Sequence, residues 1–576
     1  MKKIILFLSI ICLICGLTSC NQPDNSDMIP SEPVVYENAV DIVLSDIGIT
    51  VAGEAISTDS NNEVYSANDI VYYESGKDFT YGEGSESDSH TAEVAAEHTV
   101  LHITKAGVYK IQGKLSKGQI AIDLGTDAKE DPTAVVTLVL NGVDITCQVA
   151  PAIIFYRVYE CGNTDTETAT KDVDTSAAGA NVIIADGTEN TVNGSYVARI
   201  YKPGTVVLNE AGTEVEDAKK LHKYDGALYS KMSMNVCGEP NGSGKLTIYA
   251  ENEGLDTELH LTINGGIIDI FSGNDGINTN EDGVSVTTIN GGDLTLTVTG
   301  ETGEGDGIDS NGWLVINGGT VKAYACAMSG DAGIDSDMGI YINGGTVLAT
   351  GNMLDRIAGA QQNCAIFNFI KSQVAGSKIV FKSSAKTMLE TELKNNCSIL
   401  IYSNPELNTG KYTLYVNDVQ YGTSVGGEMG NSNGMMPGGE MPEGQQPPDM
   451  QGGQPSEMPN GQQPQMPNDQ PPEMPDGQRP QMPNGQQPSE IPQGGMAPEN
   501  GGMGQGGRPN DQGNSIAELS NKFEIADGIN TFYSVGEYTG GNNNLVWIIV
   551  ISVVIAGLVA YGIIVTVKLY DKKKQA

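Results

Sequence analysis

Acidic residues recur in short phrases that could bind a divalent cation. Each phrase sets a glycine and one apolar residue between carboxylates or amides, as at 306–309 (Asp-Gly-Ile-Asp) and 331–335 (Asp-Ala-Gly-Ile-Asp). Carboxylate, amide and bared carbonyl oxygens are the ligands that Ca²⁺ takes at flexible geometry. We therefore predict several Ca²⁺ sites, with the candidate ligands Glu253, Asp256, Asn274, Asp275, Asn278, Asn280, Asp282, Glu304, Asp306, Asp309, Asp331, Asp335 and Asp337.

The charge balance favours a bound cation over the alternative, in which these side chains only make Asx turns and ladders at corners. The chain has 72 Asp and Glu against 32 Lys and Arg, and between Leu246 and Arg356 the only Lys or Arg is Lys322. Stacked carboxylates without counter-ions repel one another, and bound calcium removes that repulsion. The same acidity argues against nucleic acid and anionic lipid surfaces as partners.

A second phrase, Ile-Asn-Gly-Gly, indicates the elements that position the acidic residues. It occurs at 263–266, 289–292, 316–319 and 342–345, spaced 26, 27 and 26 residues apart. Each copy closes one short alternating apolar run and opens another, so the repeating unit is strand, turn, strand. One such coil cannot bury its apolar face alone, so successive coils must stack. This predicts an all-β fold: a single-stranded right-handed parallel β-helix, or solenoid, with irregular caps. The apolar residue of each acidic phrase points into its core.

Composition divides the chain into parts. We predict a lipoprotein signal peptide (1–19), a polar tether (20–35), the β-helix domain (36–424, with regular coils at about 225–351), a disordered stalk rich in Gly, Pro, Gln and Met (425–514), a membrane-proximal segment (515–544), a transmembrane helix (545–567) and a basic tail (568–576). Residues 17–20 resemble a bacterial lipobox, which implies a lipid on Cys20.

The uncharged run 545–567 is long enough to span a bilayer, and the lysines after it place the tail in the cytoplasm. The protein is thus expected on a bacterial cell membrane through a lipid anchor and a transmembrane helix, with its β-helix on the extracellular face. No oligomer is predicted.

Several phrases together resemble one family. They are 107–113 (Gly-Val-Tyr-Lys-Ile-Gln-Gly), 118–120, 139–145 and 186–190, with the two repeated phrases above. They are similar to the clostridial-type parallel β-helix carbohydrate-binding proteins, which look like pectate lyases without catalysis. The resemblance covers roughly residues 40–420 and departs from the pattern at 337–338 and 352–362. It implies calcium along the helix and binding of an extracellular polysaccharide, either cellulose-like or acidic galacturonan.

Two physical routes to polysaccharide binding are open. Neutral chains would stack on exposed rings, for which Trp313, Tyr324, Tyr341 and Tyr249 are candidates, although these rings could equally pack on the solenoid flank. Acidic chains would need calcium to bridge carboxylate to carboxylate.

Catalysis is not predicted. A uronan lyase of this shape needs an Arg or Lys base, and Lys322 alone is poor provision. A hydrolase would need a carboxylate pair such as Asp306 with Asp309, or Asp331 with Asp335. The rival functions are a polysaccharide lyase or hydrolase acting on uronan, and a structural adhesin that binds a protein partner.

Overall fold

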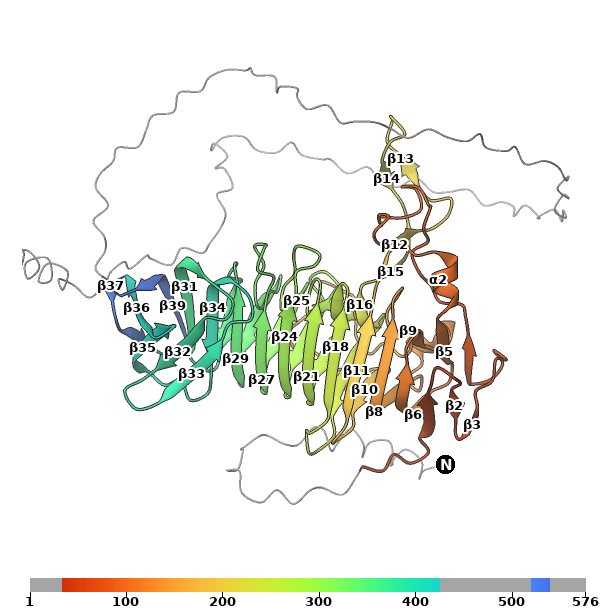
Figure 1. Cartoon of the computed structure of the whole chain (residues 1–576), viewed down its shortest axis with the longest axis horizontal. Helices are drawn as coiled ribbons and strands as arrows, with labels where there is room; N and C mark the ends of the chain where they lie inside the picture. The colour runs from red at the N-terminus through yellow and green to blue at the C-terminus, as the bar shows by residue number, and fades with distance from the viewer. Residues whose placement is uncertain (1–33, 425–518, 539–576) are drawn as a thin grey trace, which may run out of the picture. The chain divides into compact units, whose positions relative to one another are not determined.

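The computed structural model describes residues 34–424 and 519–538, and these residues are all-β as the sequence predicts. Within the described ranges the helical elements are α2 (Ala92–Ala96) and the 3₁₀ turn η1 (Thr126–Glu130), while strands supply the rest of the regular structure. Figure 1 shows these strands following one another side by side along the long axis.

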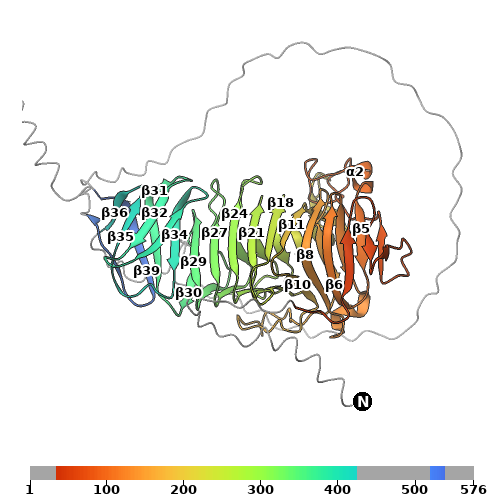
Figure 2. The ribbon, with the colours of Figure 1, turned by 60° about the horizontal axis from the view of Figure 1, so that its bottom comes forward.

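Successive strands pair in parallel with the equivalent strand one coil later, forming ladders along the stack (Figure 2). The first ladder comprises β1 (Val40–Leu44), β6 (Gly107–Leu115), β8 (Val136–Cys147), β10 (Ala180–Ile184), β17 (Met234–Gly238), β20 (Leu261–Ile263), β23 (Val286–Ile289), β26 (Trp313–Ile316), β28 (Gly339–Ile342) and β30 (Ile357–Ala360).

The second ladder continues from β8 through β11 (Glu189–Gly194), β18 (Lys245–Ala250), β21 (Ile267–Ser272), β24 (Asp293–Val298), β27 (Thr320–Tyr324) and β29 (Thr346–Gly351). The third comprises β5 (Thr99–Ile103), β7 (Gly118–Asp123), β9 (Ile153–Arg157), β16 (Gly226–Ser230), β19 (Glu253–Thr257), β22 (Ile277–Thr279) and β25 (Ile308–Ser310). We call residues 40–360, which carry these ladders, the coil stack.

The repeated phrases stack in register. In the first ladder Ile263 lies opposite Ile289, which lies opposite Ile316, and all three are fully buried. In the third ladder the apolar residues of the acidic phrases do the same, with Leu255 opposite Ile277 and Ile277 opposite Ile308. The prediction that this apolar residue points inward is confirmed.

The corners explain why glycine and asparagine repeat. The last glycine of the Ile-Asn-Gly-Gly phrase adopts positive φ, 101° at Gly292 and 78° at Gly319, which β-carbons disfavour. The phrase's asparagines form a ladder along the stack: Asn290 Nδ2 donates to Asn264 Oδ1 at 2.9 Å, and Asn317 Nδ2 donates to Asn290 Oδ1 at 2.9 Å. The corner is thus fixed by backbone conformation and by amide pairing.

Short antiparallel strands flank the first coils. β2 (Thr50–Val51) pairs with β1, β3 (Glu54–Ala55) pairs with β2, and β4 (Val64–Ala67) pairs with β5. Residues 197–224, called the arm, leave the stack between β11 and β16. The arm contains β12 (Val197–Tyr201) paired with β15 (Lys220–Tyr224), and β13 (Val207–Leu208) paired with β14 (Val215–Asp217). It protrudes beside α2 in Figure 1.

The C-terminal end of the stack is covered by a second hydrophobic cluster. Its strands are β31 (Cys364–Gln373), β32 (Lys378–Lys382), β33 (Thr387–Glu392), β34 (Cys397–Ser403), β35 (Gly410–Val416), β36 (Val419–Ser424), β37 (Leu519–Ser520), β38 (Phe523–Ile525) and β39 (Ile529–Glu537). β34 pairs antiparallel with β29, and β39 pairs with β31 and β36. We call residues 364–424 and 519–538 the C-terminal cap. The sequence places 515–544 near the membrane and gives no sign of this pairing.

Several sequence predictions fall outside the described residues. They are the signal peptide with Cys20, most of the tether, the stalk at 425–514, the span at 545–567 and the tail at 568–576. Within the described ranges, no helix is long and apolar enough to cross a membrane.

Phe523 tests whether β37–β39 are an integral part of the cap. It is fully buried, with its ring 5.4 Å from Phe367 and 5.0 Å from Phe532. Phe523→Ala is expected to lower the free energy of unfolding by about 3–5 kcal/mol, because it empties a packed site. Denaturant unfolding of the full-length protein measures this, with Tyr533→Ala, 59% exposed, as a control that changes stability by about 0.5 kcal/mol or less. Equal effects of the two substitutions would contradict the packing described here.

Candidate metal centre

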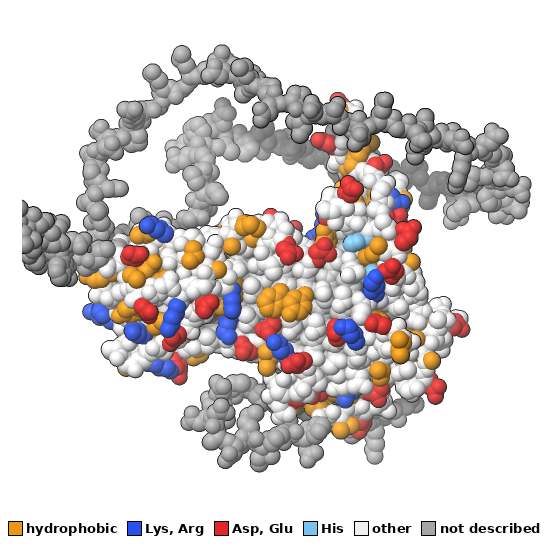
Figure 3. Space-filling view, in the orientation of Figure 1, with side chains coloured by type: hydrophobic (Ala, Val, Ile, Leu, Met, Phe, Trp, Pro, Cys, Tyr) orange, Lys and Arg blue, Asp and Glu red, His pale blue; other side chains and the backbone are white. Residues whose placement is uncertain are grey.

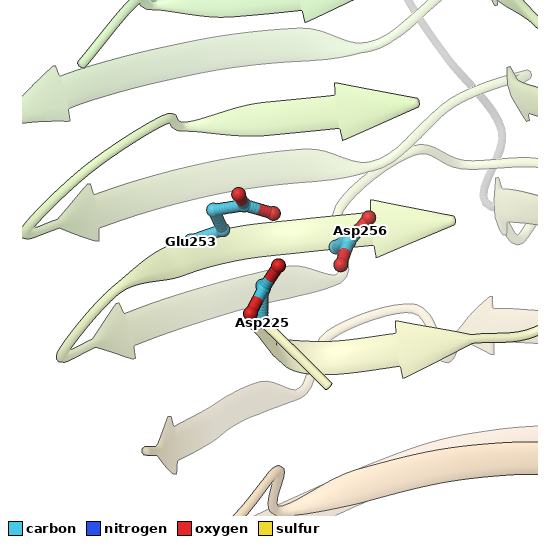
Figure 4. A group of neighbouring side chains, drawn as sticks. All are labelled: Asp225, Glu253 and Asp256. Carbon is cyan, nitrogen blue, oxygen red and sulfur yellow. The ribbon is translucent and has the colours of Figure 1, made fainter. Parts of the chain in front are cut away.

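Three carboxylates meet on two adjacent coils of the third ladder. Asp225 immediately precedes β16, and Glu253 and Asp256 lie on β19, which pairs with it (Figure 4). One oxygen from each side chain lies within 4.8 Å of the others. The three side chains are 6%, 4% and 0% exposed respectively. We call these residues the first cluster.

Parts of the first cluster have unmet hydrogen-bonding capacity. Asn278 Nδ2 donates to Glu253 Oε1 at 3.2 Å, and Asn280 Nδ2 donates to Asp256 Oδ1 at 2.5 Å. In the described part of the chain, Glu253 Oε2, Asp256 Oδ2 and Asn278 Oδ1 are buried without any hydrogen-bond partner. A buried oxygen without a hydrogen-bond partner destabilises the folded state by about as much as a lost hydrogen bond, and by more when the oxygen is charged. The cluster therefore needs a proton or a cation.

A lysine reaches the first cluster, contrary to the expectation that no cation lies near the acidic phrases. Lys223, on the arm strand β15, forms an ion pair with Asp225. Burial lowers the pKa of Lys223, but Asp225 opposes this and holds that pKa above its usual value. One charged lysine faces three carboxylates. Burial and neighbouring carboxylates accordingly raise the pKa of Glu253 and of Asp256 well above normal.

Sequence reasoning missed Asp225 and Lys223 as site residues. A signal for Asp225 exists, because residues 224–228 (Tyr-Asp-Gly-Ala-Leu) are an earlier, diverged copy of the acidic phrase. No local signal exists for Lys223, since the arm that carries it follows no repeat.

A second cluster forms two coils further on. Asp309 lies on β25, with Asp306 just before it and Asp335 in the loop after β27, and their oxygens lie within 4.8 Å of one another. In the third ladder Asp309 is opposite Asn278, so the two clusters follow one line along the stack. Burial raises the pKa of Asp335 to about 7, and the adjacent Asp355 adds to this rise.

Some of the predicted ligands also hold the corners together. Asp275 Oδ1 accepts a hydrogen bond from the backbone N–H of Asp306 at 2.7 Å, and Asp306 Oδ1 accepts one from the backbone N–H of Ala332 at 2.6 Å. Asp331 Oδ2 accepts one from the backbone N–H of Gly305 at 2.6 Å. These bonds join adjacent coils and are therefore ladder contacts rather than local Asx turns. Each carboxylate has a second oxygen, so a structural role for one oxygen and a ligand role for the other are compatible.

The other predicted ligands lie outside the two clusters. Asn274 is half-buried, whereas Asp282, Glu304 and Asp337 are exposed. Asp282 Oδ1 accepts a hydrogen bond from Asn311 Nδ2 at 3.0 Å. The donors of both clusters are carboxylate oxygens, with the amide oxygen of Asn278 beside the first cluster, and this set suits a hard cation such as Ca²⁺ better than a thiolate-preferring or imidazole-preferring metal.

The predicted aromatic residues do not form one row. Tyr324 is 2% exposed and packs with the C-terminal cap, so the expectation that it offers a face to a sugar is wrong. Trp313 and Tyr341 are partly exposed on the first ladder. Tyr249, 46% exposed on the second ladder, stacks on Phe271 with ring centroids 5.3 Å apart.

The residues near the clusters suit binding better than proton abstraction. Lys223 is held in its charged form, which cannot act as a base. Lys322 lies on the second ladder, 3.8 Å from Asp293, rather than on the third ladder with the clusters. His260 is 3% exposed, and burial lowers its pKa to about 4.

The titration of the second cluster predicts how stability depends on pH when divalent cations are chelated. Burial, with neighbouring carboxylates, raises the pKa to about 6 at Asp309, about 7 at Asp335 and about 9 at Asp306. The folded state then holds protons that the unfolded chain releases near pH 4, so stability is lost as pH rises through the folded pKa values. In chelator, the melting temperature is expected to fall between about pH 5 and pH 9.

Thermal melts at a series of pH values measure this dependence. Asp306→Asn is expected to weaken it, because the substitution removes the group with the most strongly raised pKa of the three. A melting temperature that rises over the same range would contradict the assignment.

Part of the chain is similar to known proteins. Residues 97–380 match the profile of a family described as "Carbohydrate-binding domain-containing protein". Among solved structures, a polysaccharide lyase-like protein from C. thermocellum aligns at 19% identity and a TM-score of 0.30, covering 56% of this chain and 99% of that chain. No curated protein matches. The matched family is one of carbohydrate binding, and the range 97–380 contains both clusters.

Proposed function

We propose that this chain binds an extracellular polysaccharide through a coil stack that is a right-handed parallel β-helix stabilised by Ca²⁺. The observation that carries the proposal is the set of buried, unpaired oxygens of Glu253, Asp256 and Asn278, inside the range matched by the carbohydrate-binding family. The ligand is a cellulose-like or an acidic galacturonan chain, bound without turnover.

Each of the two clusters would hold one cation. Asp225, Glu253, Asp256 and Asn278 would supply oxygens to one ion, and the second cluster would hold another. Bound Ca²⁺ would supply the positive charge that these carboxylates lack. At the second cluster, whose carboxylates are partly exposed, its remaining coordination positions would be open to a sugar carboxylate. The chain's own role is to keep the oxygens at a fixed spacing through the in-register pairing of β16, β19, β22 and β25.

The location follows from the predicted anchors. A lipid on Cys20 and a membrane span at 545–567 would hold the protein on the outer face of a bacterial cell membrane. The stalk at 425–514 would extend the binding domain away from the bilayer. Both anchors lie outside the described residues and are part of the proposal.

A retention experiment tests the function. Detergent-solubilised full-length protein is mixed with insoluble cellulose and with polygalacturonate, in Ca²⁺ and in chelator, while unsaturated products and reducing ends are assayed. Calcium-dependent retention without product is expected. Product release would support the rival lyase or hydrolase. Absence of retention on these and other polysaccharides would favour a protein ligand.

Asp256→Asn tests the first cluster as a cation site. The substitution keeps the volume of the side chain but removes the charge of a carboxylate that is fully buried. Calcium bound at one site is expected to raise the free energy of unfolding of the wild-type protein by about 2.7 kcal/mol when Ca²⁺ exceeds its dissociation constant about 100-fold. The variant is expected to lose most of this calcium-dependent stabilisation at the first cluster. Calcium-dependent thermal melts measure it.

Glu301→Gln is the matched control, because Glu301 is an exposed acid on a nearby coil. It should leave the calcium-dependent stabilisation unchanged. If Asp256→Asn retained the full response to calcium, the first cluster would not be the site.

A further inference from the structure

Two adjoining cavities open between the arm and the first coils. Their volumes are about 790 and 420 Å³, and they share the lining residues Val71 and His222. The larger lies between residues 70–81 and the arm, and the smaller lies over β5, β7 and β9 of the third ladder. Together we call them the arm groove. Cavities of this size accommodate small ligands. Figure 3 shows histidine, basic (Lys or Arg) and acidic side chains gathered where the arm leaves the stack.

The arm groove continues the face that carries the carboxylate clusters. In the third ladder His102 lies opposite Ala121, Ala121 opposite Ile154, Ile154 opposite Tyr229, and Tyr229 opposite Asp256. Side chains at one register position point to the same side of a sheet. The first cluster and the arm groove therefore lie on the same side of the third ladder, with the buried residues Ile154 and Tyr229 between them.

The smaller cavity is lined by the basic side chains of Arg157, Lys231 and two histidines, in a chain whose net charge is −40. Arg157 Nε donates to Asp123 Oδ1 at 2.6 Å, with a second bond from Nη2 to Oδ2, and His102 Nε2 lies 2.7 Å from Asp69 Oδ1. Lys231 differs from them, because within the described ranges it has no ion pair with a carboxylate. Its Nζ lies 5.8 Å from the centre of the Tyr224 ring. Lys231 is thus a cation available to an anionic ligand.

The remaining lining fits a sugar. Tyr72, Tyr81 and Tyr201 line the larger cavity, and Tyr156 and Tyr224 line the smaller one. Tyrosine combines a flat apolar ring with a polar tip, which suits a sugar's apolar face and hydroxyl edge. The Arg157–Asp123 pair holds donors and acceptors in fixed directions. A groove of rings and fixed polar groups, with a lysine that has no ion pair among the described residues, matches a sugar that carries a carboxylate.

We propose that the arm groove binds a carboxylate-bearing sugar unit of the polysaccharide, with Lys231 as the contact to the carboxylate. The inference rests on the proposed function and adds a second site on the same face. The carboxylate clusters hold one part of the chain through cations, and the arm groove holds a further unit through protein groups. The arm closes the N-terminal end of this face.

Calorimetric titration of the full-length protein in saturating Ca²⁺ tests the site. The probes are trigalacturonate and its methyl ester, which lacks the charge but keeps the ring. Lys231→Gln is expected to weaken binding of the acid about tenfold, which corresponds to about 1.4 kcal/mol, and to leave the weaker binding of the ester unchanged. Lys231→Arg should restore most of the affinity because it restores the charge. Lys322→Gln, a lysine on the second ladder, is the control and should change neither affinity.

The outcomes separate this inference from the function on which it rests. If wild type binds the acid and Lys231→Gln binds it equally well at an unchanged melting temperature, the groove assignment is overturned while polysaccharide binding stands. If wild type binds the ester as tightly as the acid, recognition of the carboxylate is overturned. If wild type binds neither these probes nor any polysaccharide, the proposed function and this inference fail together.

Discussion

In-register stacking of parallel coils is the constraint on which the rest of this structure depends. Neighbouring strands lie about 4.8 Å apart, so each side chain, inward or outward, sits directly above its equivalent in the next coil. For apolar residues this produces a continuous core, as with Ile263, Ile289 and Ile316. For amides it produces the ladder of Asn264, Asn290 and Asn317, in which each side chain satisfies the next. For carboxylates the same geometry is unfavourable, since two unit charges about 5 Å apart repel by about 3 kcal/mol at an effective dielectric constant of 20.

The chain meets this repulsion in different ways along one ladder. Asp275 and Asp306 each direct one oxygen to a backbone N–H of the next coil, which stabilises charge locally. Asp225 has the ion pair with Lys223. Glu253 and Asp256 have neither, and each keeps a buried oxygen without a partner in the described residues. A single lysine can neutralise only one of three carboxylates, so this is the point at which an external cation would contribute most.

Local repetition made much of the fold predictable. The Ile-Asn-Gly-Gly phrase specifies its own corner, and the alternation around it specifies which side chains are buried, so the all-β class and the stacked isoleucines follow from sequence. Contacts between distant segments could not be predicted in this way. The alternation correctly places Tyr324 on the outward side of its strand. The C-terminal cap lies against this strand, where Asn395 donates hydrogen bonds to the carbonyl oxygens of Tyr324 and Ala325. The ring of Tyr324 is therefore buried.

The same limit applies to the cap and to the candidate site. β39 pairs with β31 although more than 150 residues separate Asn363 from Gly528, whose backbone N–H donates to Asn363 Oδ1. Nothing local in either segment encodes that pairing. Within the site, the carboxylates of the regular repeated phrases were identified, whereas Asp225, in a diverged copy, was missed. Lys223 and Asp355 were also missed, because each reaches its cluster from a segment outside the repeats.

The arm shows what an interruption of the repeats adds to a stacked fold. Identical coils generate a flat, repeated face, and a concave site on that face needs a segment that leaves the stack and returns. The arm leaves the stack and returns to it within one coil, and its last strand, β15, runs back over the third ladder. Along β15, His222 and Tyr224 line the arm groove, while Lys223 between them pairs with Asp225 of the first cluster. Because one short strand carries both sets of contacts, the charge of the first cluster and the wall of the arm groove depend on the same backbone segment.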